Sequence, residues 1–139
     1  MKIPRISLCI ILLLTFGCKT VRYTNHSITL GRGGGFIGKY DSYTLKGNGE
    51  VFSTNAASAG SAPVSLSKKL DKKTVADLFS KAAALQFPNP EFNHPGNMTY
   101  YIEYFDGKQT HTIKWGDFNL QPPISFKAFF DETWKTVKN

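Results

Sequence analysis

Apolar and polar positions alternate in the first third of the chain, and this pattern predicts three short β-strands. They cover residues 27–30, 43–46 and 51–54. A glycine-rich run at 31–38 lies between the first two strands, and the small residues at 55–67 are expected to form a loop. Three consecutive strands with no helix between them indicate antiparallel pairing.

The turn between the second and third strands is expected within Gly47-Asn48-Gly49-Glu50. Asn-Gly favours a two-residue hairpin turn in which both residues take a positive φ. Such a turn sets Leu45 opposite Phe52 and Tyr43 opposite Thr54, which gives the hairpin one apolar face.

A helix is predicted from Asp71, which can cap its first turn, to about Gln86. Its apolar residues recur at helical spacing on one face: Val75, Leu78, Phe79, Ala82 and Leu85. Phe87-Pro88-Asn89-Pro90 ends the helix, and a proline-containing loop continues through Asn97.

Residues 98–115 predict a second hairpin, in which Asp106-Gly107 forms a two-residue turn. In this register the apolar face pairs Ile102 with His111, Tyr100 with Ile113 and Met98 with Trp115. The mostly polar face pairs Glu103 with Thr110 and Tyr101 with Thr112. One apolar and one polar face are typical of a sheet that is covered on a single side.

A second helix is expected to begin at Pro123 and to bury one stripe of side chains. The stripe consists of Phe126, Phe129, Phe130, Thr133, Trp134 and Val137. Trp115 and Trp134 should therefore both be buried. The order of elements is β-β-β-α-β-β-α, which predicts an α+β fold: an antiparallel sheet of four to five strands with two helices on one face.

The amino-terminal segment resembles the signal peptide of a bacterial lipoprotein. Lys2 and Arg5 precede an apolar run at 6–16, which is too short to cross a bilayer. The run ends in Gly17-Cys18, as in a lipobox, although Thr15 and Phe16 depart from the usual pattern. An ordinary secretory signal with a cysteine placed by chance is the alternative.

We therefore expect residues 1–17 to be a signal peptide, 18–26 a lipidated cysteine with a short tether, and 27–139 a single globular domain. Cys9 leaves with the signal peptide, so a lipidated Cys18 leaves no thiol for a nucleophile, a metal site or a disulfide. Residues 19–21 lack an acidic cluster, which favours the periplasmic face of the outer membrane as the location.

Charge changes this interpretation little. Two of the 17 Lys and Arg residues and none of the 10 acidic residues lie in the signal peptide, so the remaining chain carries +5. Lys68-Lys69 and Lys72-Lys73 flank the start of the first helix, where a solvated face is expected. We expect no nucleic-acid binding; attraction to anionic lipid or to an acidic partner is the alternative.

The glycine run matches two nucleotide-binding patterns by letter. Gly33-x-Gly35-x-x-Gly38 fits a dinucleotide fingerprint, and with Lys39 the run nearly fits a phosphate-binding loop, except that Tyr40 replaces Ser or Thr. Both motifs require a helix immediately after the glycines, because its N-terminal amides bind the phosphate. A strand is expected here, so no nucleotide is expected to bind.

No catalytic or metal-binding pattern is visible elsewhere. His26, His94 and His111 lack ligand spacing, and the serines of Ser58-Ala59-Gly60-Ser61 do not form a nucleophile elbow. The carboxylates are few and dispersed. We therefore expect no enzyme activity, no cofactor and no metal.

Three segments together carry a family resemblance. They are Gly33-Gly34-Gly35-Phe36-Ile37-Gly38 after a strand, the helix at 75–85 followed by Phe87, and Tyr100-Tyr101-Ile102-Glu103-Tyr104-Phe105-Asp106-Gly107 with His111-Thr112-Ile113 and a closing helix. Over roughly residues 27–137 the chain resembles emfourin-type proteins, small inhibitors of thermolysin-like metalloproteases. It departs from them in the loop at 55–67, in a third consecutive glycine and in the lipidation signal. The resemblance implies a protease inhibitor whose partner is a secreted or periplasmic metalloprotease.

The expected function is that of a non-enzymatic, membrane-anchored envelope lipoprotein with a small protein-binding domain. The glycine run is the candidate surface, because its exposed backbone can lie along a partner's cleft. A flexible or bulged connection that needs positive φ values is the alternative for this run. Its candidate residues are Arg32, Gly33, Gly34, Gly35, Phe36 and Lys39. The alternatives are a structural or accessory lipoprotein without inhibitory activity, and a hydrolase whose site leaves no motif.

Overall fold

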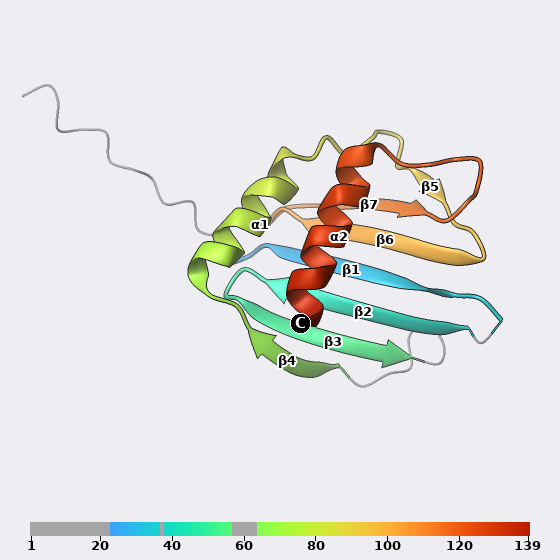
Figure 1. Cartoon of the computed structure of the whole chain (residues 1–139). Coiled ribbons are helices and arrows are strands. Elements are labelled where there is room, and N and C mark those ends of the chain that lie inside the picture. The colour runs from blue at the N-terminus through green and yellow to red at the C-terminus, as the bar shows by residue number, and fades with distance from the viewer. Residues whose placement is uncertain (1–22, 37, 57–63) are drawn as a thin grey trace, which may run out of the picture.

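The computed structural model describes residues 23–36, 38–56 and 64–139 (Figure 1). The predicted signal peptide and Cys18 lie outside these residues. The elements are β1 (Ser27–Gly34), β2 (Lys39–Lys46), β3 (Glu50–Ala56), β4 (Ser65–Lys69), α1 (Lys72–Ala84), β5 (Asn93–His94), β6 (Met98–Phe105), β7 (Thr110–Trp115) and α2 (Ile124–Lys138). The strands form one seven-stranded sheet in the order β4-β3-β2-β1-β6-β7-β5.

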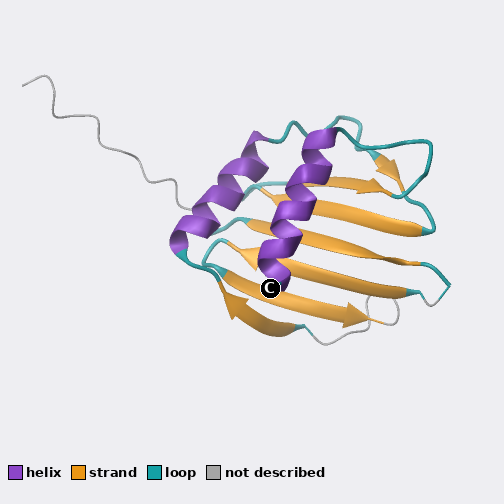
Figure 2. Ribbon diagram, in the orientation of Figure 1, coloured by secondary structure: helices purple, strands orange, loops and turns teal. Residues whose placement is uncertain are grey.

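Both helices cover the same face of this sheet, as Figure 2 shows, so the chain has an α+β fold in which the described residues cover one sheet face and leave the other open. The sheet differs from the prediction in two strands. β4 contains residues 65–67, which were expected to be part of a loop, and β5 lies in the segment expected to be irregular. β5 also pairs with β7 in parallel, which makes the sheet mixed.

The first hairpin has a register one residue away from the predicted one. Leu45 pairs with Val51, because the loop has three residues and not two. The N–H of Gly49 donates to the carbonyl of Lys46 (2.8 Å), and Gly49 is the loop residue with a positive φ (+91°). A slip by one residue exchanges the two faces of a strand, so Val51 is buried in the core and Phe52 lies on the open face.

The second hairpin is shifted by two residues, because its loop has four residues. The Asp106 carboxylate accepts from the backbone N–H groups of Lys108 and Gln109, both at 2.9 Å. His111 consequently faces Tyr104, and the prediction that it faces Ile102 is wrong. A two-residue shift keeps every side chain on its predicted face, so Ile102 now pairs with Ile113 in the core and Tyr100 pairs with Trp115.

Both helices follow their predicted patterns. Asp71 caps α1, where its carboxylate accepts from the N–H groups of Lys73 and Thr74. All six residues of the predicted α2 stripe are buried, with Pro123 in the N-cap position. The predicted burial of both tryptophans is confirmed, because Trp115 and Trp134 are 5% and 9% exposed.

Candidate functional site

The glycine run divides into a structural half and an exposed half. Arg32, Gly33 and Gly34 belong to β1, which is paired with β2 on one side and β6 on the other. Their main chain is therefore occupied by two neighbouring strands. A partner can reach unpaired backbone groups of the run only beyond Gly34. This contradicts the expectation that the backbone of the whole run is exposed.

The glycines inside β1 are required by close packing. A Cβ added to Gly33 would overlap with the ring of Tyr40, and the neighbouring Gly31 is covered in the same way by the ring of Tyr101. Both rings lie on the open face of the sheet, across positions where β1 has no side chain. A Cβ at Gly34 would collide with the carbonyl oxygen of Asn97. This role of the glycines depends on aromatic rings from two neighbouring strands, so the local sequence does not reveal it.

Arg32 packs on the helix-covered face. Its guanidinium carbon lies 4.8 Å from the centre of the Trp134 ring, a cation–π distance. Tyr43 meets the same ring edge-on at 5.1 Å, and Phe130 stacks on it at 5.3 Å. Arg32 therefore supports the core and is only partly available to a partner.

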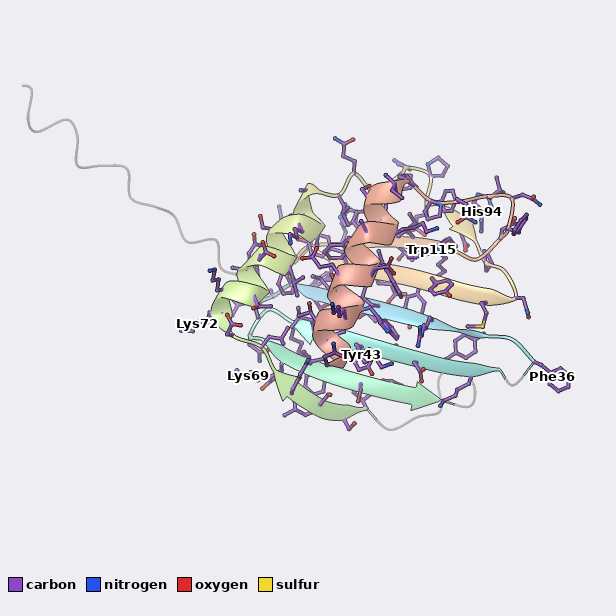
Figure 3. The ribbon with its side chains drawn as sticks, in the orientation of Figure 1. Phe36, Tyr43, Lys69, Lys72, His94 and Trp115 are labelled. Carbon is purple, nitrogen blue, oxygen red and sulfur yellow. The ribbon has the colours of Figure 1, made fainter. Side chains whose placement is uncertain are left out.

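The exposed half of the run is the β1–β2 turn. The N–H of Gly38 donates to the carbonyl of Gly35 at 3.1 Å, which closes the turn. The side chain of Phe36 is fully exposed and points away from the domain at the tip of the hairpin (Figure 3). Lys39, the first residue of β2, is also exposed. Of the six predicted contact residues, Gly35, Phe36 and Lys39 lie on the accessible surface.

Two further apolar side chains lie at the same end of the sheet. Met98 is 41% exposed and Phe118 is 92% exposed. Gly35 donates its N–H to the carbonyl of Asn97 (2.6 Å), and a Cβ on Gly35 would lie 3.5 Å from the Met98 sulfur, so the turn touches the start of β6. Met98 and Phe118 in turn line one hollow of about 370 Å³. We call Gly35, Phe36, Met98 and Phe118 the apolar rim.

The exposure of Met98 and Phe118 is not predicted by the sequence pattern. Met98 was expected opposite Trp115 on the apolar face; it does lie on that face, but at the exposed end of β6. Phe118 follows β7 in a loop that had no predicted structure. An apolar residue in a loop rich in Gly, Asp and Asn was the one available signal.

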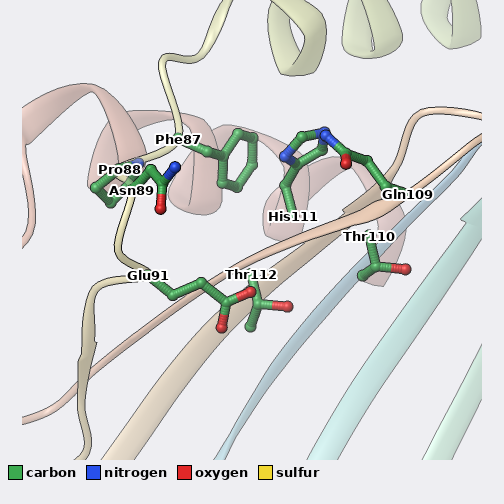
Figure 4. Close-up of a pocket in the computed structure, with 8 residues that line it drawn as sticks. All are labelled: Phe87, Pro88, Asn89, Glu91, Gln109, Thr110, His111 and Thr112. Atoms are coloured by element: carbon green, nitrogen blue, oxygen red, sulfur yellow. The ribbon is translucent and has the colours of Figure 1, made fainter.

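A second cluster surrounds His111, between two hollows of about 320 Å³ each. One hollow is shown in Figure 4. His111 lies 5.4 Å from the Phe87 ring, and its Nε2 is 2.9 Å from an Asp106 oxygen. Hydrogen bonds from the backbone of Gln109, from His111 and from the backbone of Lys108 hold the pKa of the Asp106 carboxyl well below its usual value.

This cluster stabilises the turn more clearly than it builds a reactive site. Thr110 and Thr112 line the shown hollow, but alternation along β7 places them on the face opposite to His111. Among the described residues, no group of three His, Cys, Asp or Glu side chains is arranged to hold a metal ion. The geometry therefore favours the apolar rim as the candidate site.

Comparison of the chain with models of known families and with curated proteins finds no match. Within the described part of the chain, neither helix is both long and apolar enough to span a bilayer.

Proposed function

We propose that this chain is a non-enzymatic lipoprotein of the bacterial cell envelope whose domain binds another protein through the apolar rim. The observation that carries the proposal is the exposure of Phe36, Met98 and Phe118 together at one end of the sheet. Contiguous exposed apolar side chains mark interaction surfaces, and aromatic residues contribute a large share of binding energy.

The rim is suited to binding because the sheet fixes its position. Phe36 projects from a closed turn between two paired strands, and Gly35 is tied to the start of β6 by a hydrogen bond. A side chain presented from a hydrogen-bonded turn loses less conformational freedom on binding than one on an unsupported loop. Phe36 would fill an apolar pocket of the partner, while Lys39 would contact its edge.

The proposed partner class follows from the resemblance to emfourin-type inhibitors, namely a secreted or periplasmic metalloprotease. The proposed anchor is lipid on Cys18, at the periplasmic face of the outer membrane. Three acyl chains would hold the protein on the bilayer, because each buried methylene contributes about 0.8 kcal/mol.

The rim is tested by Phe36→Ala in an inhibition assay with thermolysin-like proteases, with Leu66→Ala as the control. Leu66 is an exposed apolar residue of β4, away from the rim. Loss of a central aromatic contact costs about 2 kcal/mol or more, so affinity should fall about 30-fold with an unchanged melting temperature. A photo-crosslinking residue at position 36 should also capture the partner in cells, and one at position 66 should not.

If the wild-type domain slows no protease and position 36 crosslinks to nothing, the rim is not a binding site. A structural or accessory role for the lipoprotein would then be the better explanation.

The anchor is tested separately with a fatty-acid probe in growing cells. Wild-type chain should take up the probe, and Cys18→Ser should not, because that side chain lacks the thiol that accepts the lipid. Equal labelling of the two forms would contradict a lipid on Cys18.

A further inference from the structure

The chain enters the domain at the end of the sheet opposite to the apolar rim. Tyr23 is the first described residue, and its ring stacks on Phe79 at 5.2 Å. Its carbonyl accepts from the N–H of His26 at 2.8 Å and lies against Gly47 in the β2–β3 turn. We call this end, formed by residues 23–26, 46–50, 68–73 and 106–109, the basic end.

The tether leaves little freedom in where a lipid anchor can lie. Five residue steps separate Cys18 from Tyr23. At no more than about 3.6 Å per residue, they span at most about 18 Å. A lipid on Cys18 therefore holds the basic end within one such length of the bilayer surface.

This end also carries the whole net charge of the described residues. Its segments contain six Lys residues and three acidic residues, whereas the rest of the described residues contain seven Lys and Arg and seven acidic residues. Lys69, Lys72, Lys73 and Lys108 are exposed on it. In the described segments, no carboxylate lies within ion-pair distance of these four lysines.

Two of the three acids of the basic end are engaged with the protein itself. The Asp71 carboxylate accepts backbone N–H groups of α1, and the Asp106 carboxylate accepts those of the β6–β7 turn. Glu50 lies opposite Lys69 in the register of β3 and β4, but the two side chains form no ion pair. Lys72, Lys73 and Lys108 are thus left to face an external anion. Figure 3 places Lys69 and Lys72 at the end of the domain opposite to Phe36.

We propose that the basic end docks on anionic phospholipid headgroups and turns the apolar rim away from the membrane. The inference rests on the proposed lipid anchor for its place in the cell, while the docking itself is a property of the domain. The tether length selects a bilayer over an acidic protein as the occupant. Strands of eight residues span about 27 Å, so the rim would stand roughly that far above the headgroups.

The first test measures how strongly the unlipidated chain partitions onto vesicles. The chain used begins at Cys18 and contains every described residue. Phosphatidylglycerol vesicles should bind it and phosphatidylcholine vesicles should not. Each lysine at an anionic surface contributes roughly fivefold, so Lys72→Gln/Lys73→Gln/Lys108→Gln should weaken binding on the order of 100-fold. The control, Lys39→Gln/Lys114→Gln/Lys127→Gln, removes the same charge from the other half and should change binding less than about threefold.

The second test measures orientation. The chain is coupled through Cys18, the one cysteine left after the signal peptide, to maleimide lipid in the same vesicles, so the result is independent of lipidation in cells. On anionic but not neutral vesicles, amide hydrogen exchange should slow at residues 71–73 and 106–109 and stay unchanged at 35–36. Equal losses of vesicle binding in the two triple variants would overturn the docking proposal, and so would slower amide exchange at residues 35–36 instead. A failed fatty-acid label on Cys18 would overturn only the proposed anchor.

Discussion

Replacing Trp134 by Ala should remove about 3–5 kcal/mol from the free energy of unfolding. The indole is 9% exposed and contacts Phe130, Tyr43 and Arg32. A buried tryptophan removes roughly 200 Å² from water, which at about 25 cal/mol per Å² corresponds to roughly 5 kcal/mol before the smaller contribution of alanine is subtracted. The melting temperature should fall by about 12–20 °C for a domain of this size.

Urea denaturation followed by far-UV circular dichroism measures this loss without relying on the deleted fluorophore. Phe118→Ala removes an aromatic ring that is 92% exposed, so it is the control and should change stability by less than about 0.5 kcal/mol. Trp134→Phe should fall between the two. If Trp134→Ala shifts the urea midpoint no further than Phe118→Ala, the packing of α2 on the sheet described above is wrong.

Three smaller changes test other contacts. Gly34→Ala should lower stability by about 2 kcal/mol or more in urea melts, because Gly34 has a φ of +119° and a methyl group would collide with the Asn97 carbonyl; Gly35→Ala, which meets only the Met98 sulfur at 3.5 Å, should lower it less. Thr133→Val should raise the melting temperature, corresponding to about 1 kcal/mol, because the buried Thr133 hydroxyl has no hydrogen-bond partner in the described structure, and a lower melting temperature would show that it has one. Asp106→Asn should flatten the acid limb of a plot of unfolding free energy against pH: folding lowers the pKa of this carboxyl, so its contribution is complete above the ordinary pKa of 3.8 and is lost as the pH falls from there towards the folded-state pKa. An unchanged acid limb would show that Asp106 has the same pKa in the folded and unfolded chain.

The helices could be predicted from the sequence because their patterns are local. Asp71 caps α1 through groups two and three residues away, and the α2 stripe repeats at the spacing of one helix face. The hairpin registers could not be predicted in the same way, because the loop length decides them. The Asp106 side chain stabilises a four-residue loop where Asp-Gly alone favours two residues.

The missing strands have a physical explanation too. β4 joins the sheet through backbone pairing while most of its side chains stay exposed, so it has no apolar alternation to detect. β5 has two residues, and its pairing with β7 depends on the packing around it. The apolar rim could be predicted only in part, for a similar reason. Phe36 stands out in the glycine run, whereas Met98 and Phe118 reach it only when β6 and β7 are in place.

The central position of β1 has a consequence for how the domain folds. β1 pairs with β2 nearby in sequence, but its other neighbour, β6, lies 64 to 78 residues further along the chain. The middle of the sheet therefore cannot form until residues 98–105 are available to pair with β1. Closing so long a loop slows folding. Until then, the edge of β1 that β6 later covers offers unpaired backbone groups to other unfolded chains. Aggregation during folding should therefore depend more on how fast residues 98–105 pair with β1 than on the stability of the folded domain.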